Sequence, residues 1–262
     1  MLKPCRTSPF VQMLRDFPAL LWYNICNELL EVNCVALLDK LELRTARVIS
    51  IVGSGGKTTL LYGLAREFAR LGKRVAVTTT THIFRPSDSD LPVFTNGMPP
   101  LSPGCIAVVG TPAGEKLSCP PTPLLDQLAR SADVLLIESD GSRRLPVKFP
   151  RAGEPVLIPQ TDQVLLVVGL SALGRPVHEV CHRWEFAQET LGLDANSLLS
   201  PEWLARLLIQ GYGKITPHPQ VILNQADTLS DPKLGDEVCQ FLLPHFSHIS
   251  ILSLHQEVIS PC

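Results

Sequence analysis

The residue types that bind phosphate occur together in one short run, at positions 53–59. The run reads Gly53, Ser54, Gly55, Gly56, Lys57, Thr58 and Thr59. Glycines allow the backbone to turn tightly, so that several N–H groups point at phosphate oxygens. The lysine can reach the β- and γ-phosphates, and the first threonine hydroxyl can bind Mg²⁺. The run predicts a nucleotide-binding loop for ATP or GTP, with Lys57 as a catalytic residue and Thr58 as a metal ligand.

The spacing of this run departs from the GxxxxGK[ST] pattern, which requires glycine at the position of Ile51. It is the compact G-x-x-G-K-T-T form, which is similar to the phosphate loop of Mur-type ligases (GTNGKTT). An ordinary glycine-rich turn between a strand and a helix is the alternative interpretation. The order of apolar strand, loop, Lys-Thr pair and amphipathic helix favours nucleotide binding.

Two carboxylates follow the apolar run at 134–138. Glu138 ends this expected strand and Asp140 stands two positions later, so both point the same way if the strand continues. In phosphate-loop proteins, an acid at the tip of a neighbouring strand reaches the metal, usually through water. We predict that Glu138 acts in catalysis, that both carboxylates hold Mg²⁺, and that the Gly141 N–H contacts the γ-phosphate. The alternative is a surface turn with two solvated acids.

Three cations come directly after these acids: Arg143, Arg144 and Lys148. One of them, for which we choose Arg143, would neutralise the phosphate during transfer or contact an anionic second substrate. A solvated basic face is the alternative interpretation of all three.

A threonine run ends the strand expected at 75–79. Ligands in open α/β sheets bind at the carboxyl ends of the strands. Thr80, Thr81 and His82 would therefore lie near the γ-phosphate, and we predict that the two threonines contact the nucleotide. Since β-branched residues also suit strands, a purely structural role is the alternative.

The segment 224–227 ends another expected strand and resembles the N-K-x-D guanine-reading motif of GTPases. Asp227 would accept hydrogen bonds from the base and Asn224 would brace neighbouring loops. Gln225 replaces the lysine of that motif, which leaves ATP and GTP both open. An ordinary Asn-x-x-Asp turn is the alternative.

His178 and His182 are four residues apart with Cys181 between them, a spacing that aligns ligands only on a helix. Because Gly174 and Pro176 precede them, we expect a loop here and not a transition-metal site.

Strands that alternate with helices predict an α/β fold, a P-loop NTPase-like, mainly parallel sheet with helices on both faces. Residues 1–44 are expected to be a helical appendage, partly disordered, and 45–262 the nucleotide-binding domain. A proline-rich insertion at about 85–123 contains one short strand, at 106–109. The further expected strands are 47–52, 75–79, 134–138, 164–168, 221–224 and 249–254. The expected helices are 58–71, 124–130, 183–191, 201–209 (with Ser200 as N-cap) and 233–242.

Composition excludes several classes of protein. The chain has 262 residues and a net charge of −2, so no basic excess supports nucleic-acid binding. The eight cysteines form no CxxC pair, which favours reduced thiols over a disulfide framework. No apolar run approaches the length that spans a bilayer. We expect a cytoplasmic protein without a membrane partner.

The motifs taken together resemble the YqeC-type family. The segments that carry the resemblance cover roughly 37–262 and read VGSGGKTTLLYGLA, VTTTTHIF, LLIESDGSRRLPVKFP, EPVLIP, VVGLSALG, CHRWE and VILNQAD. Within them, ESDG also resembles the E-[ST]-x-G motif of metallochaperone GTPases. The family resemblance implies an accessory role in the maturation of selenium-dependent molybdenum hydroxylases. We expect LPVKFP to form part of a second-substrate or partner site.

Three functions remain open from the sequence. The first is a Mg²⁺-dependent nucleoside triphosphatase that acts in selenium or molybdenum cofactor assembly. The second is an ATP-dependent ligase or kinase that acts on a small anionic substrate. The third is a nucleotide-gated chaperone that hydrolyses nothing.

Overall fold

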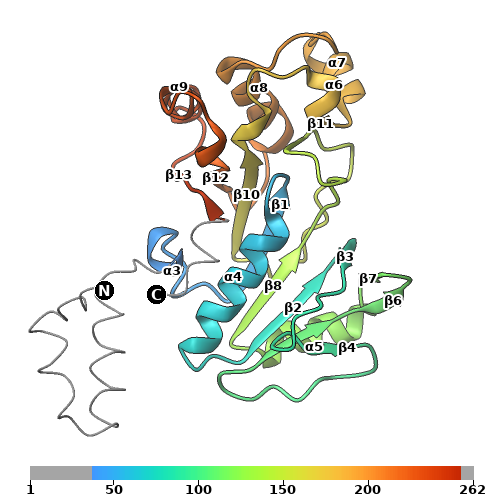
Figure 1. The fold of residues 1–262 in the computed structure, drawn as a ribbon. Helices are drawn as coiled ribbons and strands as arrows, with labels where there is room; N and C mark the ends of the chain where they lie inside the picture. Colours follow the sequence, from blue (N-terminus) through green and yellow to red (C-terminus); the bar gives the residue numbers. More distant parts are fainter. Residues whose placement is uncertain (1–36, 255–262) are drawn as a thin grey trace, which may run out of the picture. The chain divides into compact units, whose positions relative to one another are not determined.

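The chain folds around one large parallel sheet, seen in a computed structural model that describes residues 37–254. Eight strands lie in the order β13-β12-β10-β1-β8-β2-β5-β4, and every neighbouring pair is parallel (Figure 1). β1 has β8 on one side and β10 on the other, although neither follows it directly in the chain. This order confirms the predicted P-loop NTPase-like α/β fold.

The strands of this sheet are β1 (Val48–Gly53), β2 (Val75–Thr79), β4 (Val93–Phe94), β5 (Ile106–Val109), β8 (Val134–Glu138), β10 (Gln163–Gly169), β12 (Gln220–Asn224) and β13 (Ile249–Ile251). The helices are α3 (Leu37–Lys40), α4 (Lys57–Arg70), α5 (Thr122–Ser131), α6 (Val177–Val180), α7 (Trp184–Leu191), α8 (Pro201–Tyr212) and α9 (Lys233–Leu242), with the 3-10 turns η2 (Leu170–Ala172) and η3 (Ala226–Thr228). Ser200 caps α8 as expected, since its Oγ accepts a hydrogen bond from the Trp203 N–H.

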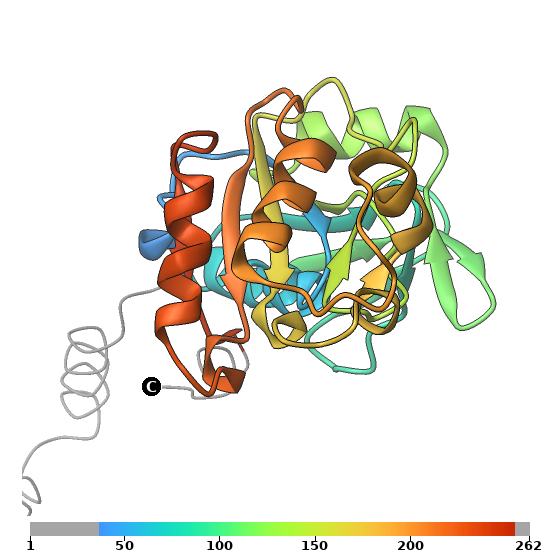
Figure 2. The same cartoon turned by 90° about the horizontal axis from the view of Figure 1, so that it is seen from above.

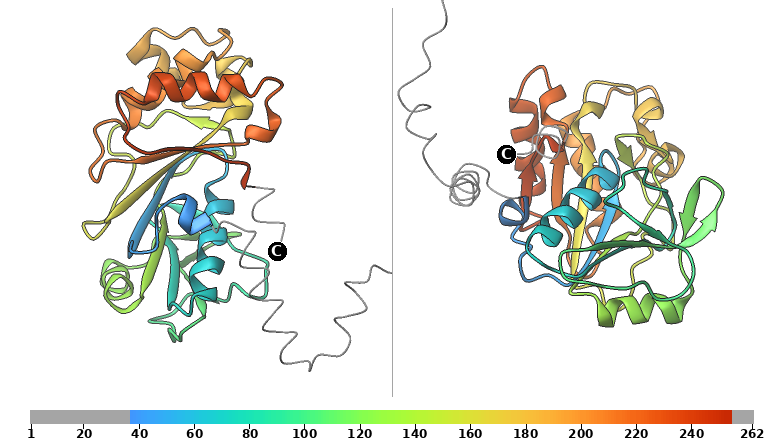
Figure 3. Two further views of the ribbon diagram at one scale, coloured as in Figure 1. Left: turned by 90° about the vertical axis from the view of Figure 1, so that its left-hand side faces the viewer. Right: turned by 60° about the horizontal axis from the view of Figure 1, so that its bottom comes forward.

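Helices cover both faces of the sheet. Along β10, Leu165 and Val167 pack in the cluster that holds α3 and α4, while Leu166 and Val168 pack in the cluster that holds α8 and α9. This alternation is the two-residue period of a strand that is buried on both sides. α5 packs over a third cluster, on the face opposite α4 (Figures 2 and 3).

Two small sheets extend from the main one. β9 (Val147–Lys148) pairs with β11 (Cys181–His182) in parallel, while β3 (His82–Phe84), β7 (Lys116–Ser118) and β6 (Thr111–Ala113) form an antiparallel sheet. The proline-rich stretch at 85–123 therefore holds more strands than the one expected there. Its β5 is an inner strand of the main sheet, between β2 and β4.

Two expected elements differ from the structure. The segment after Pro176 is not all loop, because Val177–Val180 form the short helix α6 and Cys181 then enters β11. The last strand stops at Ile251, because its three residues pair with only three of β12. Most of the expected appendage, residues 1–36, lies outside the described residues. Between Leu37 and Leu254, no helix is long and apolar enough to span a bilayer.

Candidate functional site

The glycine-rich loop fills the turn between β1 and α4, where three glycines have positive φ. Gly53, Gly55 and Gly56 have φ angles of 88°, 78° and 133°. A Cβ on Gly55 would lie 2.4 Å from the Gly169 N, and a Cβ on Gly53 would lie 2.2 Å from the Val167 O. Only glycine combines this backbone with such close approach to other backbone atoms. The loop therefore depends on these glycines for its shape.

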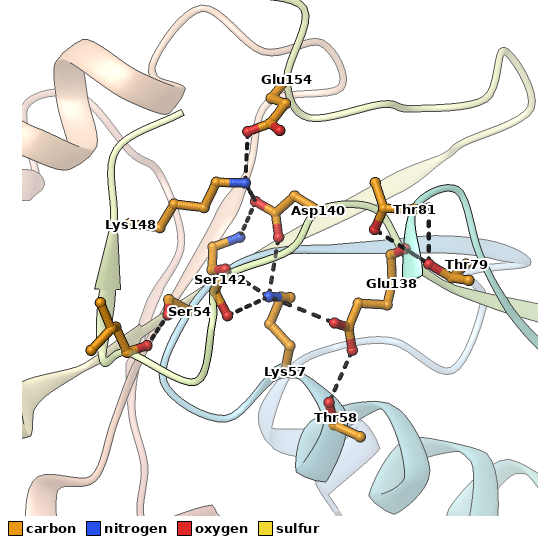
Figure 4. Close-up of polar contacts among 12 residues, drawn as sticks. Ser54, Lys57, Thr58, Thr79, Thr81, Glu138, Asp140, Ser142, Lys148 and Glu154 are labelled. Carbon is orange, nitrogen blue, oxygen red and sulfur yellow. Dashed lines mark hydrogen bonds and ion pairs between the residues drawn. The ribbon is translucent and has the colours of Figure 1, made fainter. Parts of the chain in front are cut away.

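Lys57 is the first residue of α4, and its side chain points back toward the glycine-rich loop. Its Nζ donates to the Gly53 O at 2.8 Å and to the Ser142 Oγ at 3.1 Å. The same Nζ lies 3.1 Å from the Asp140 Oδ1 and 3.8 Å from the Glu138 Oε1 (Figure 4). The ammonium group is thus held at the loop by four oxygen atoms.

Thr58 and Glu138 face each other across the start of α4. The exposed Thr58 donates its hydroxyl to the Glu138 Oε2 at 3.0 Å. Glu138 ends β8 and is buried, and this burial raises the pKa of its carboxyl above the ordinary value. The nearby Lys57 and the Thr58 hydroxyl oppose that shift. A threonine hydroxyl beside a carboxylate is a set of hard oxygen donors, the kind that Mg²⁺ prefers. Between Leu37 and Leu254, no group of three or more His, Cys, Asp or Glu side chains is arranged to hold a metal.

Asp140 is fully buried and turned toward cations. Its Oδ2 accepts a hydrogen bond from the Gly53 N–H at 3.0 Å and lies 3.3 Å from the Lys148 Nζ. Its Oδ1 pairs with Lys57. The carboxylate thus faces two ammonium groups and a loop N–H, and it makes no contact with the Thr58 hydroxyl. Its predicted role as a second metal ligand stays a prediction.

Lys148 is wholly buried, so the alternative interpretation of a solvated basic face is wrong for this residue. Its Nζ lies 2.7 Å from the Glu154 Oε2, in addition to its contact with Asp140. Glu154 in turn binds Arg183, which precedes α7. Burial raises the pKa of the Glu154 carboxyl, but the hydrogen bonds from Arg183 and Lys148 outweigh it and bring the pKa to about 2. A chain of alternating charges therefore runs from Lys57 to Arg183.

The sequence patterns do not predict that Glu154 and Arg183 belong to this network. Both lie in segments that also carry the family resemblance, EPVLIP and CHRWE. The signal that could have found them is a lysine within the apolar segment LPVKFP, because a lysine buried in such a segment requires a carboxylate partner from elsewhere in the chain.

The two exposed arginines after the acids have different surroundings. Arg143 and Arg144 both adopt left-handed backbone conformations, with φ of 50° and 63°. The Arg144 guanidinium lies over the Phe84 ring, 4.5 Å from its centroid. Arg143 instead lines a pocket with Leu145, whose carbonyl accepts a hydrogen bond from the Ser54 hydroxyl of the loop.

The threonine run secures the ends of two strands. Thr79 is buried and donates its hydroxyl to the Glu138 O at 2.8 Å, which joins β2 to β8 where both end. Thr80 donates its hydroxyl to the Val156 O, and the Thr81 N–H donates to the Thr79 Oγ1. Thr81 and Thr79 lie beside Glu138 (Figure 4). The run thus reaches the acidic strand end, while Gly141, Thr59 and His82 are exposed around it.

Asn224 braces the glycine-rich loop, as the resemblance to the base motif predicted for it. Its Nδ2 donates to the Gly55 O at 2.7 Å, and its Oδ1 accepts from the Leu254 N–H at 2.9 Å. Gln225 has a φ of 64° and accepts a hydrogen bond from the Ser171 hydroxyl. Asp227 is exposed in η3. The structure brings Asn224 to the loop, and base contact by Asp227 stays a prediction.

The site lies at the carboxyl edge of a parallel sheet. It consists of the strand β1, a tight glycine turn and the Lys-Thr pair that begins the helix α4, and it lies beside the acidic end of β8. Fold and loop together define an α/β protein of the P-loop NTPase-like class.

Comparison with known proteins narrows this class. The model of the YqeC protein family matches residues 49–185, which run from β1 into the first turn of α7. The chain is also 35% identical over 185 residues to the protein of Escherichia coli (strain K12) named "Uncharacterized protein YqeC", covering 66% of this chain and 72% of that protein. The chain therefore belongs to the YqeC family.

Proposed function

We propose that this protein binds a nucleoside triphosphate together with Mg²⁺ at the loop 53–59 and hydrolyses it. One observation carries the proposal: Lys57 and Thr58, at the start of α4, contact two carboxylates from the end of the adjacent strand β8. A lysine and a hydroxyl at a glycine-rich helix start, beside an acidic strand tip, are the parts with which phosphate-loop enzymes hold nucleotide and metal.

Each group would have a defined task. The loop N–H groups and Lys57 would bind the phosphates and stabilise the charge that develops during transfer. Thr58 and Glu138 would hold Mg²⁺, which supplies positive charge to the phosphate oxygens when bound. The oxygens of Asp140 face cations, so we assign it to orienting Lys57.

Calorimetry tests this proposal with ATP and GTP, each with and without Mg²⁺. We expect Mg²⁺-dependent binding by the natural protein and loss of binding in Lys57→Ala. Thr58→Val is the second variant, because the exposed Thr58 can be changed without opening the core. Lys73→Ala, an exposed lysine beyond the end of α4, is the matched control. Absence of binding for both nucleotides would overturn the proposal.

The same titration shows whether the protein prefers the guanine or the adenine nucleotide. Selective GTP binding would support base reading by Asp227, despite Gln225 in place of the usual lysine. Selective ATP binding would leave Asn224 and Asp227 as structural residues and support ligase or kinase chemistry. Release of inorganic phosphate, followed over time, separates a hydrolase from a protein that only binds the nucleotide.

The wider role that we propose is that of an accessory protein in the maturation of selenium-dependent molybdenum hydroxylases. It is supported by the family resemblance of the segments quoted above. The test is the selenium content and activity of a client hydroxylase isolated from cells that carry the Lys57→Ala variant. Both should fall relative to cells with Lys73→Ala, and a fully active, selenium-loaded client would contradict the proposed role.

A further inference from the structure

A pocket lies beside the start of α7, and one of its lining residues, Leu145, is hydrogen-bonded to Ser54 of the glycine-rich loop. Its volume is about 540 Å³. It is lined by residues of α6, β11, the first turn of α7 and the segment before β9.

The polar lining of this pocket favours an anion. Arg143 and Arg183 provide two guanidinium groups, against the single carboxylate of Glu185. α7 begins at Trp184 without a side-chain cap, so the positive end of its dipole lies at the pocket wall. A guanidinium has five N–H donors, and the contact between Arg183 and Glu154 employs one end of it.

The apolar lining favours a flat ring. Trp184 and Phe186 both line the pocket, and 42% of the Phe186 surface is exposed. An exposed phenylalanine beside a half-buried tryptophan is a surface on which a planar ring can stack. Leu145 and the buried Cys181 add further apolar wall.

Two connections join the pocket to the phosphate loop. The carbonyl of Leu145 accepts the hydroxyl of the loop residue Ser54. The second connection is the chain of ion pairs from Arg183 through Glu154, Lys148 and Asp140 to Lys57. A ligand that draws Arg183 from Glu154 would therefore act on the lysine that binds phosphate.

We propose that this pocket binds the second substrate of the reaction, a small planar aromatic compound that carries a phosphate or carboxylate group. The assignment as a second-substrate site rests on the proposed nucleotide function, whereas the binding of such a compound does not. Arg143 and Arg183 would bind the anionic group, and Trp184 and Phe186 would contact the ring.

The test uses three probes of matched shape and different charge: 4-nitrophenyl phosphate, 4-nitrobenzoate and the neutral 4-nitrobenzyl alcohol. Binding is measured by calorimetry on the natural protein, on Arg143→Gln and on Phe186→Ala. Both changed residues are exposed, so the fold should persist. Arg206→Gln is the matched control, because Arg206 is an exposed arginine of α8 outside the pocket. Lys57→Ala reports whether a probe occupies the phosphate loop instead.

We expect at least one anionic probe to bind at one site per chain and the alcohol to bind at least tenfold more weakly. Arg143→Gln and Phe186→Ala should each weaken the anion about tenfold, as loss of one charged or stacked contact does. Arg206→Gln should leave probe binding unchanged. Lys57→Ala should weaken probe binding less than Arg143→Gln does, because Arg143 lines the pocket and Lys57 does not. The preferred anion distinguishes a phosphorylated ligand from a carboxylic acid.

Three results would overturn the inference. The first is that neither anion binds. The second is that the alcohol binds as tightly as the anions. The third is that Lys57→Ala abolishes probe binding whereas Arg143→Gln leaves it unchanged. Failure of nucleotide binding is measured separately, with ATP and GTP. If the protein binds the probe but no nucleotide, the pocket proposal stands and the proposed nucleotide function is wrong. If it binds nucleotide but no probe, the proposed function stands and the pocket proposal is wrong.

Discussion

The Lys57 Nζ lies 3.1 Å from the Asp140 Oδ1, and both side chains are buried. The other oxygen of the same carboxylate accepts the Gly53 N–H at 3.0 Å. An ammonium and a loop N–H are the donors that a phosphate loop offers to phosphate. If the loop binds phosphate as proposed, Asp140 competes with that phosphate for the same two groups.

This competition predicts opposite effects of Asp140→Asn on nucleotide affinity and on stability. Without the negative charge, Lys57 is available to phosphate, and affinity for the Mg²⁺-free nucleotide should rise on the order of tenfold. The free energy of unfolding should fall by about 3 kcal/mol, because Lys57 and Lys148 lose a buried partner. Calorimetry and denaturant titration measure the two effects. Weaker binding in the variant would show that Asp140 helps to hold the ligand.

Gly55→Ala should abolish nucleotide binding. The new Cβ would meet the Gly169 N at 2.4 Å in a backbone with φ of 78°, so the loop must move. Gly72→Ala is the matched control, since Gly72 has a φ of 74° and a Cβ added there would have no neighbouring atom within 4 Å. The control should cost about 1 kcal/mol through backbone strain alone and keep full affinity. Equal affinity in both variants would contradict the dependence of the site on loop shape.

Asn224→Asp and Asp227→Ala should separate loop bracing from base reading. Asn224→Asp removes the donor to the Gly55 O, so it should weaken ATP and GTP alike and lower stability by about 1–3 kcal/mol. Asp227 is exposed, so its replacement should leave the melting temperature unchanged. If Asp227 reads guanine, only GTP affinity falls in that variant. Affinity that falls equally for both nucleotides would contradict base reading.

His182 should titrate well below an ordinary histidine. Burial, followed by the charges of Arg183 and Lys148, lowers its pKa to about 4. Because the folded pKa lies below the unfolded value near 6.5, the unfolded chain takes up the proton first. The stability contribution of His182 is thus complete above pH 6.5 and is lost as pH falls toward 4.

NMR titration of the imidazole measures this pKa directly, and Arg183→Gln should raise it toward 6.5. Denaturant titrations of His182→Gln should show a flatter loss of stability between pH 6.5 and 4. A His182 pKa near 6.5 in the natural protein would contradict the predicted electrostatics.

Much of the fold was predictable because its signals are local. The bounds of β2, β8 and α9 agree with those expected, since continuous apolar runs and helical periodicity reflect burial of neighbouring residues. The shape of the glycine-rich loop was predictable for a related reason. Gly53, Gly55 and Gly56 each meet a backbone requirement that no other residue type meets.

The ion-pair chain was not predictable in this way. In the sequence, Lys148 follows Arg143 and Arg144, and the local pattern does not distinguish it from those two cations. In the structure, it is buried between Asp140 and Glu154, while Arg143 lines a pocket. Charge at a position can be seen in the sequence, but whether the charge is solvated depends on segments that are remote in the chain.

The sequence by itself determined the parallel α/β architecture, the family and the position of the glycine-rich loop, because each depends on residue type and short-range spacing. Only the tertiary structure decided which carboxylate faces Lys57, that Asn224 braces Gly55, and that Arg183 connects a second pocket to the loop. These contacts join segments that are far apart in the sequence. They form because strands that are neighbours in the sheet, such as β1 and β8, are not consecutive in the chain.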